Sequence, residues 1–262
     1  MRIYKTGTGI LTCFLILLIC IAFAGIPVSA GTRDVEAKEK KDMTIVFTHD
    51  LHSHLDSFTT ELNGEEQEVG GFARLKTFID ETKAEDGDIL VLDGGDFSMG
   101  TLYQTVFETQ AAELRMLGFL GVDVTTLGNH EFDYRARGLA NMLNTAAESG
   151  DMLPAMVLCN VDWEATMAKA SEKTAASGAA SSEEDIAALK EAFDRYGITD
   201  YVMLEKNGIR IAVTGVFGKD ALVCAPTCEL VFRDPVKAMK ETVAQIQEKE
   251  AADMIVCLSE RC

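Results

Sequence analysis

The chain has 262 residues and a formal charge of −18 at pH 7, with 42 acidic and 24 basic residues. Such a surface repels phosphate backbones, which excludes a nucleic-acid polymer as a partner. Apolar residues make up 47% of the chain, which excludes global disorder and is enough to build a sizeable core. Small anionic substrates are repelled as well, unless bound divalent cations reverse the local field.

The N-terminus has the order of a secretory signal, in which basic residues precede an apolar core at 14–24 and small residues follow. We expect a signal peptide over residues 1–30, cleavage after Ala30, and a mature chain that is secreted or extracytoplasmic. The alternative is an uncleaved anchor over the uncharged stretch 6–32, which would tether the chain to a membrane. The dense apolar part is short, and this favours the cleaved signal.

A polar, charged leader is predicted over residues 31–42, before short apolar runs begin to alternate with longer amphipathic segments. The apolar runs predict buried strands over 43–48, 89–92, 122–127, 155–159, 201–205, 209–216 and 254–258. The amphipathic segments predict helices over 71–84, 107–118, 135–148 and 234–250. Alternating strands and helices are typical of an α/β fold with parallel strand pairing.

Residues 164–195 interrupt this alternation because they are rich in Ala, Ser, Glu and Lys. We interpret them as a surface insertion, with a polar linker around residues 177–182 and a helix from about Glu183. A lid or a partner site is an alternative that no residue in the segment requires.

Polar residues follow three of the predicted strands at the point where each strand ends. Asp50 and His52 follow the first strand, Asp96 follows the second, and Asn129 and His130 follow the third. All four histidines of the chain lie in the first and third of these loops. Each motif alone is an ordinary turn, but open α/β sheets place ligand sites at the carboxyl ends of their strands. The coincidence at three strand ends therefore predicts a functional site.

The residue types at these strand ends suit metal binding. In an extended segment Asp50 and His52 point the same way, so both can reach one metal ion. The carboxylate of Asp96 can bridge two cations, and the amide of Asn129 offers a neutral oxygen. Because His130 is next in sequence to Asn129, we expect its side chain to point elsewhere, towards a substrate.

Other residues near these motifs have plainer interpretations. His49 and His54 flank the Asp-x-His motif and are expected to be exposed or to support it from outside. Asp93 is expected to cap a strand end rather than to bind metal. Cys224 and Cys228 are spaced to close a local disulfide, while Cys159 and Cys257 lie in apolar runs that suit buried thiols.

Three stretches, THDLHSHL from residue 48, VLDGGDFSMG from residue 91 and TTLGNHEFDY from residue 125, resemble the metal-binding motifs of the calcineurin-like metallophosphoesterases. Among these, the chain is most similar to the secreted 5'-nucleotidase / 2',3'-cyclic-nucleotide phosphodiesterase family. The segments GGFARLK after the first motif and NGIRIAVTGVFG from residue 207 add to this resemblance. The likeness predicts one metallophosphoesterase domain over residues 43–262, with 164–195 as an addition to it.

The resemblance implies a four-layer α/β/β/α sandwich with a dinuclear centre of divalent ions, whether Mn, Zn, Fe or Ca. Asp50 and His52 would hold the first ion, Asp96 would bridge, and Asn129 would hold the second. The implied substrate is a nucleotide or another small phosphate ester, hydrolysed by in-line attack on phosphorus.

The resemblance also implies the catalytic groups. His130 would lie against the phosphoryl oxygens or the leaving group, as an acid or a stabiliser of charge, and Asp133 would support it. Asn129 and His130 would therefore both contact the substrate.

The chain departs from the family pattern after its last predicted strand. Family members complete the site with three further histidines, whereas here Glu260 follows the strand and no histidine follows His130. One interpretation is that the fold is incomplete at the C-terminus and the chain is a truncated, catalytically impaired remnant with weak metal binding. The other is a natural short form in which Glu260 replaces a ligand; truncation is favoured because the last strand lacks an onward connection.

Overall fold

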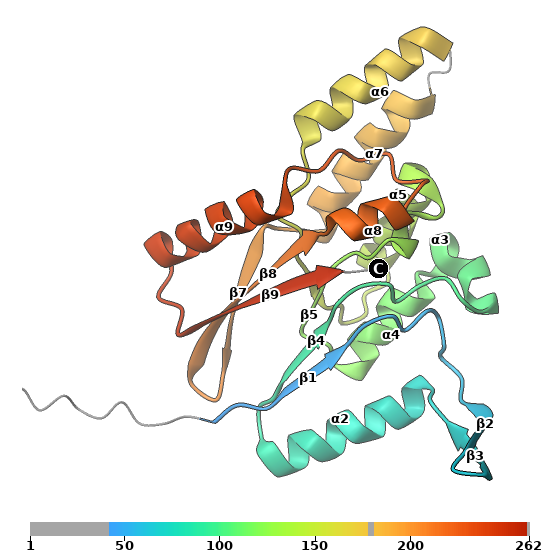
Figure 1. The fold of residues 1–262 in the computed structure, drawn as a ribbon, viewed down its shortest axis with the longest axis vertical. Coiled ribbons are helices and arrows are strands. Elements are labelled where there is room, and N and C mark those ends of the chain that lie inside the picture. The colour runs from blue at the N-terminus through green and yellow to red at the C-terminus, as the bar shows by residue number, and fades with distance from the viewer. Residues whose placement is uncertain (1–41, 178–180, 261–262) are drawn as a thin grey trace, which may run out of the picture. The chain divides into compact units, whose positions relative to one another are not determined.

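The computed structural model describes residues 42–177 and 181–260. Its strands are β1 (Ile45–Thr48), β2 (Phe58–Leu62), β3 (Glu65–Val69), β4 (Leu90–Asp93), β5 (Val124–Thr125), β6 (Ala155–Met156), β7 (Tyr201–Lys206), β8 (Ile209–Phe217) and β9 (Met254–Glu260). Its α-helices are α2 (Phe72–Asp86), α3 (Phe107–Gln110), α4 (Ala112–Leu120), α5 (Arg135–Glu148), α6 (Trp163–Ser177), α7 (Ser181–Tyr196), α8 (Lys219–Cys224) and α9 (Pro235–Lys249). Two 3-10 turns, η1 (Leu102–Val106) and η2 (His130–Phe132), complete the elements (Figure 1).

Two separate sheets form the centre of the fold. The first has the order β1-β4-β5-β6, and all of its strands are parallel. The second has the order β7-β8-β9, in which β7 is antiparallel and β9 parallel to β8. Because β1, β4 and β5 are parallel neighbours, their carboxyl ends meet at one edge of the first sheet. The loops that carry the expected site residues therefore emerge side by side.

The buried side chains of β4 show how the layers pack. Val91 belongs to a large core cluster with residues of α2, α4 and α5, whereas Leu90 and Leu92 belong to a second cluster with Ile211 and Val213 of β8. Because successive side chains of a strand point to opposite faces, β4 lies between a helical layer and the second sheet. Helix α9 packs on the other face of the second sheet through Ala238 (Figure 1). The arrangement is the α/β/β/α sandwich that the resemblance implies.

The prediction of one helix over residues 107–118 is wrong in one respect, because the structure has two helices there. Ala111 adopts a left-handed conformation with φ 45°, which ends α3 and begins α4. The strands expected over 122–127 and 155–159 shorten to the two residues of β5 and of β6. The third site loop therefore begins earlier than the apolar pattern indicates.

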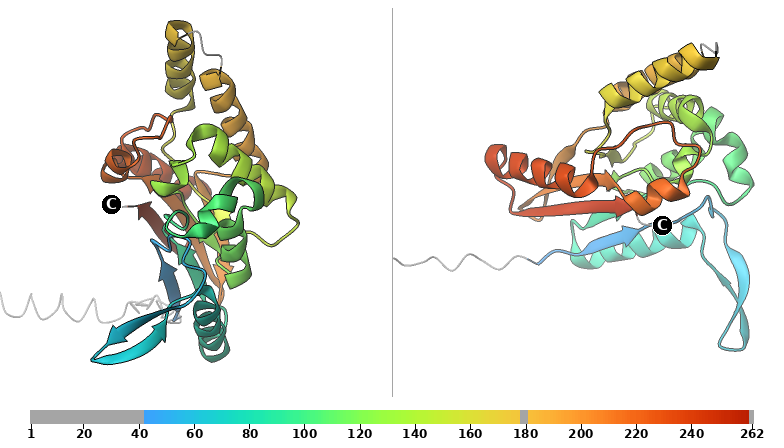
Figure 2. Two further views of the ribbon diagram at one scale, coloured as in Figure 1. Left: turned by 90° about the vertical axis from the view of Figure 1, so that its right-hand side faces the viewer. Right: turned by 45° about the horizontal axis from the view of Figure 1, so that its top comes forward.

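A β-hairpin formed by β2 and β3 was not predicted, although the sequence contains a signal for it. The strands pair from Leu62 with Glu65 to Phe58 with Val69, around a two-residue turn at Asn63 and Gly64. Both turn residues have positive φ, 56° and 83°, and Asn-Gly is the sequence most typical of such a turn. The strands are largely exposed, so they carry no clear apolar alternation; Figure 2 shows the hairpin extending away from the sheets.

The segment expected to be a surface insertion forms α6 and α7. The indole of Trp163 meets the ring of Phe193 edge-on with centroids 5.1 Å apart, which joins the two helices near the base of the pair. Ile186 and Leu189 of α7 are fully buried in the same cluster as the inner face of α5. Helix α7 therefore contributes to the core. The polar linker expected around residues 177–182 overlaps residues 178–180, which lie outside the described residues.

The predicted signal peptide, its alternative anchor and nearly all of the leader also lie outside the described residues. Within residues 42–177 and 181–260, no helix combines the length and the apolar character needed to cross a bilayer.

The local disulfide expected between Cys224 and Cys228 is wrong, because Cys228 carries a free thiol while Cys224 is disulfide-bonded. Cys159 is a buried free thiol as expected, whereas that of Cys257 is exposed.

Candidate metal centre

The loops that follow β1 and β4 run side by side beyond the ends of their strands. The backbone N–H of Asp50 donates to the carbonyl oxygen of Gly95 at 3.1 Å, and that of His52 donates to Asp96 at 3.0 Å. These bonds continue the parallel pairing that ends at Thr48 and Asp93. The first two site loops are therefore fixed relative to one another by their backbones.

The Asp-x-His motif is not extended. The expectation that an extended backbone points Asp50 and His52 in one direction is therefore wrong. Asp50 and His52 both have left-handed backbones, with φ 52° and 46°, and so has Asp96 with φ 53°. Residues other than glycine adopt this conformation rarely, at a cost of roughly 1–3 kcal/mol each, and it gathers at functional sites. The two side chains still meet, because Oδ1 of Asp50 lies 3.5 Å from Nε2 of His52.

A hydrogen bond to the backbone orients the imidazole of His52. Its Nδ1 lies 3.0 Å from the carbonyl oxygen of Met99, so the proton of the neutral ring sits on Nδ1. The lone pair of Nε2 then faces the carboxylate of Asp50. In metal-binding histidines, the ring nitrogen that does not bind the metal typically makes a hydrogen bond of this kind.

Two glycines bring the second and third loops together. A Cβ at Gly128 would lie 2.2 Å from Oδ1 of Asp96 and 2.4 Å from its backbone nitrogen. A Cβ at Gly95 would lie 2.6 Å from the nitrogen of Gly128, and Gly95 also has φ 96°. The two backbones therefore touch at a point where no side chain fits.

Asp96 lies at the middle of the three loops and is 3% exposed. Its Oδ1 accepts a hydrogen bond from the backbone N–H of His130 at 2.9 Å. Burial raises the pKa of Asp96, and the His130 N–H and the nearby imidazoles act in the opposite direction. Ligand atoms of His52, Asp96 and His130 all lie within 4.8 Å of one another. One carboxylate and two imidazoles at this spacing form a donor set that suits a divalent transition metal.

The amide of Asn129 fits a cation in the same place. One of its terminal atoms lies 3.0 Å from Oδ2 of Asp96, and the other lies 3.3 Å from the backbone nitrogen of His130. Without a cation, hydrogen bonding requires the first atom to be nitrogen, which donates to the carboxylate. With the amide turned over, two oxygens face one another, and a cation between them satisfies both. The residues present therefore fit the metal that the resemblance implies.

His130 is connected to both the metal cluster and Asp133. Its Nδ1 lies 2.8 Å from Oδ2 of Asp133, and its ring meets that of His52 edge-on with centroids 5.0 Å apart. The side chain of His130 is 37% exposed, so a small molecule can reach it from solvent. The structure thus groups His130 more closely with the metal ligands than its sequence position indicated.

The flanking histidines lie at the margin of this group. His49 is largely exposed, and its Nδ1 lies 2.5 Å from Oδ2 of Asp50. His54 makes a weaker contact, with Nδ1 3.3 Å from the carbonyl oxygen of Leu51. His49 is therefore placed to orient Asp50, whereas His54 contacts the backbone of Leu51 and the ring of Phe58.

Glu131 is a residue that the sequence analysis missed. It is fully buried, and its carboxylate accepts hydrogen bonds from the backbone N–H groups of Asp96 at 3.0 Å, Gly128 at 2.6 Å and Ser98 at 3.0 Å. The hydroxyl of Ser98 donates a fourth bond at 2.7 Å. One side chain thus ties the second loop to the third. No spacing in the sequence distinguishes this glutamate from an ordinary turn residue.

The surroundings of Glu131 act on its ionisation in opposite directions. Burial, followed by the negative charge of Asp96, raises the pKa of Glu131 to about 8. The bonds from Ser98 and Gly128 favour the ionised form and lower it. All four hydrogen-bond partners of Glu131 are donors, and an ionised carboxylate can accept a hydrogen bond from each of them.

Asp93 lies at the end of β4, as expected for a residue that caps a strand. Its carboxylate accepts hydrogen bonds from the hydroxyls of Thr48 and Thr125, both at 2.8 Å, and from the N–H of Gly95 at 3.1 Å. It thereby joins the ends of three neighbouring strands below the metal cluster. Complete burial raises the pKa of Asp93 to about 6.

We expect Asp93 to make the stability of the protein depend on pH. Because its folded pKa of about 6 exceeds the unfolded value of 3.8, its protonated form is favoured by folding and its contribution is lost as pH rises. Between about pH 4 and 6 the free energy of unfolding of the wild type, relative to Asp93→Asn, should fall by up to about 3 kcal/mol. Urea unfolding of both proteins at several pH values measures this difference. A difference that stays constant or grows with pH contradicts it.

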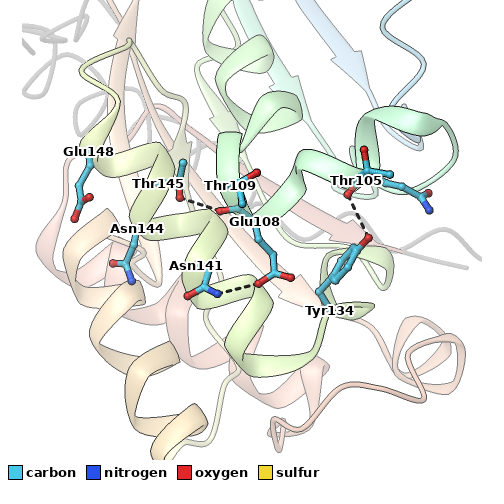
Figure 3. A pocket seen from close by; sticks show the side chains of 9 residues that line it. Thr105, Glu108, Thr109, Tyr134, Asn141, Asn144, Thr145 and Glu148 are labelled. Atoms are coloured by element: carbon cyan, nitrogen blue, oxygen red, sulfur yellow. Dashed lines mark hydrogen bonds between the residues drawn. The ribbon is translucent and has the colours of Figure 1, made fainter.

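Surface grooves adjoin the centre. A groove of about 410 Å³ is lined by Asp50 and Leu51 of the first loop together with Arg74 of α2. A second groove, of about 480 Å³, lies between η1, α3 and α5, with Tyr134 at the end nearest the third loop (Figure 3). Figure 3 shows the amide of Asn141 donating to Glu108 inside it. Among the described residues expected at the centre, only Asp50 lines either groove.

Two packed sheets between helical layers, with a carboxylate, an amide and imidazoles at adjacent strand ends, define an α/β sandwich built around a metal-binding edge. Residues 43–176 match the family model described as calcineurin-like phosphoesterase. The chain belongs to this family, which confirms the resemblance of its three motifs.

Known relatives support this membership. The chain is 30% identical over 236 residues to the trifunctional nucleotide phosphoesterase protein YfkN of Bacillus subtilis, covering 83% of this chain and 14% of that protein. It is 37% identical over 131 residues to a probable 5'-nucleotidase of Treponema pallidum, covering 48% of this chain and 21% of the relative. The chain thus spans about a fifth or less of the length of these two relatives.

Solved structures show the same fold. The 5'-nucleotidase precursor of Thermus thermophilus superposes with a TM-score of 0.63 at 28% identity, covering 84% of this chain and 37% of that one. The NAD nucleotidase of Haemophilus influenzae superposes with a TM-score of 0.61 at 22% identity, covering 83% and 34%. The second likeness concerns the fold alone.

Proposed function

We propose that this chain is a metal-dependent phosphoesterase domain that hydrolyses nucleotide phosphate esters at a centre of two divalent ions, outside the cytoplasm. The observation that carries the proposal is the grouping of His52, Asp96 and His130, from three strand ends, within 4.8 Å. The family membership supports the reaction class, and the signal-like N-terminus supports the location.

In this proposal Asp50 and His52 would hold one ion, Asn129 would hold the other, and the carboxylate of Asp96 would be shared between them. The ions would supply positive charge to the phosphoryl oxygens and raise the acidity of water. Backbone hydrogen bonds between the first two loops hold these side chains in position without a bound ion. The close contact of Gly95 with Gly128 brings Asn129 to the same point.

His130 acts on the substrate in this proposal, either donating a proton to the leaving oxygen or stabilising charge on the phosphoryl group. Asp133, 2.8 Å from Nδ1, fixes the ring so that Nε2 is the atom free to act. Its partial exposure lets an ester approach from solvent. The ring also lies close enough to His52 to contact the metal cluster, so both roles place it beside the reacting phosphate.

The substrate class rests on the relatives. Their names describe a nucleotide phosphoesterase and 5'-nucleotidases, so a nucleotide is the substrate we propose for this chain. Bound cations also answer the problem posed by a charge of −18, since they reverse the field where an anionic ester must bind.

The direct test is hydrolysis of AMP and p-nitrophenyl phosphate by the purified chain with added Mn²⁺ or Zn²⁺. His130→Ala should lower the rate by roughly 10²–10⁴, because it removes the group that transfers a proton or stabilises charge. His54→Ala is the matched control, since His54 contacts the backbone oxygen of Leu51 and the ring of Phe58 but none of the expected metal ligands. Phosphate release no greater than that of a metal-only blank contradicts the proposal.

A second candidate is a catalytically impaired domain that binds metal weakly. It is favoured by one observation, that all four histidines of this sequence lie in the first and third loops. Whether Glu260 substitutes for a ligand stays a prediction, because its side chain lies outside the described residues. Elemental analysis separates the candidates: two tightly bound ions per chain exclude the impaired domain, and substoichiometric metal supports it.

A further inference from the structure

A second polar cavity lies away from the metal cluster. It has a volume of about 130 Å³ and is enclosed by the start of α5, one face of α6, Ile186 of α7 and the loop after α8. Three cationic side chains line it, those of Arg135, Lys169 and Lys173. They gather here although the chain as a whole carries a charge of −18. None of the described residues assigned to the metal centre lines this cavity.

The carboxylate of Glu229 lines one side of the cavity and shows that the cations there bind an anionic group. Its Oε1 lies 3.4 Å from Nζ of Lys173 and 4.0 Å from the guanidinium of Arg135. Its Oε2 accepts a hydrogen bond from the N–H of Ala136, in the first turn of α5, at 3.2 Å. Three cations and one carboxylate line the cavity, and Lys169 has no ion-pair partner among the described residues.

The cavity also holds a hydroxyl group without a partner. Oγ1 of Thr227 is buried and makes no hydrogen bond with any described residue. A buried hydroxyl left without a hydrogen bond destabilises the folded protein. A ligand oxygen beside this hydroxyl would satisfy it.

We propose that this cavity binds a small tetrahedral oxyanion of the phosphate class. The three cations supply the charge attraction, and the hydroxyl of Thr227 donates a hydrogen bond to one oxygen of the ligand. At roughly 30 Å³ per water molecule, the volume holds about four waters, which is enough for an ion of this size.

Glu229 makes the site selective between oxyanions. Near neutral pH phosphate retains at least one proton and can donate it in a hydrogen bond to this carboxylate. Sulfate is fully ionised and offers only acceptors, so it meets the carboxylate as an unrelieved like charge. The site should therefore prefer phosphate to sulfate.

The test is titration of the full chain with inorganic phosphate and with sulfate at low ionic strength, with and without Mn²⁺, followed by calorimetry. Thr227→Val should weaken phosphate binding roughly tenfold, because it removes a hydrogen bond to a charged group. Its midpoint of thermal unfolding should not fall, since no bond within the described protein is lost. Thr174→Val is the matched control, because Oγ1 of Thr174 is also buried and unpartnered but lies on α6 outside the cavity.

The double variant Lys169→Gln/Lys173→Gln should abolish the binding. Lys240→Gln/Lys249→Gln on α9 makes the same change in net charge at exposed positions and should leave it intact. Equal phosphate affinity in the wild type and Thr227→Val, equal losses in the two double variants, or sulfate binding as tight as that of phosphate each overturns the proposal. Because the assay measures binding and not hydrolysis, its failure leaves the proposed reaction untouched.

Discussion

Replacing Asp96 by asparagine is expected to weaken the binding of divalent metal ions by at least roughly 100-fold, since even groups outside the ligand shell contribute about 10–100-fold. The substitution removes a buried charge at the point where the three loops meet. It keeps a side-chain oxygen that can still accept the N–H of His130, so the third loop stays in place. The loss can therefore be ascribed to the charge and not to a rearranged backbone.

Calorimetric titration with Mn²⁺, together with elemental analysis of the purified protein, measures this effect. Asp80→Asn on α2 is the matched control, because Asp80 is exposed and pairs only with Lys76 at 2.5 Å. If Asp96→Asn and Asp80→Asn bind metal equally well, the three strand ends do not form a metal centre.

The second large effect is expected for Glu131→Ala, which should lower the free energy of unfolding by about 4 kcal/mol or more. Four donors lose their acceptor in a site without solvent, and each costs about 1–3 kcal/mol when left unpaired. Glu131→Gln should cost less, because one carboxamide oxygen still serves one pair of donors. The order of stability is therefore wild type, then glutamine, then alanine.

Urea unfolding followed by circular dichroism gives these free energies. Glu148→Ala is the control, since Glu148 forms an exposed ion pair with Arg195, and such pairs contribute at most about 1 kcal/mol. A value for Glu131→Ala within about 1 kcal/mol of the control shows that the two loops are held by something other than this carboxylate.

The two effects differ in kind, and together they separate ligand from scaffold. Asp96 is an expected metal ligand, whereas Glu131 contacts the backbone of Asp96 and would act through it. A variant that keeps its stability but loses metal identifies a ligand, whereas a variant that loses stability identifies a residue that holds the loops in place. His130 can be classed by the same pair of measurements, because it lies near both the metal cluster and the expected substrate.

Much of the site could be predicted from the sequence because its residues follow buried strands. The apolar runs at β1 and β4 mark where each strand ends, and Asp50, His52 and Asp96 come directly after them. Parallel pairing then brings neighbouring carboxyl ends to one edge whatever the details of the loops. The prediction that these side chains meet succeeded although the extended conformation assumed for Asp50 and His52 was wrong.

The hairpin of β2 and β3 could also have been predicted, because Asn63-Gly64 is a strong turn signal. It was missed because apolar alternation marks only half-buried strands, and this hairpin is largely exposed. The break at Ala111 had no comparable signal. Alanine favours helix, so only packing in the tertiary structure holds it in the left-handed region.

By itself, the sequence determined the class of fold, the strand ends that carry the site and the residue types able to bind metal. Strand burial and side-chain chemistry are local properties that the order of residues already specifies. Only the tertiary structure decided that Glu131 ties two loops together, that Gly95 and Gly128 touch, and that three cations line one cavity with Glu229. These features join residues far apart in the chain, and their partners are fixed by how the layers pack, which no local pattern records.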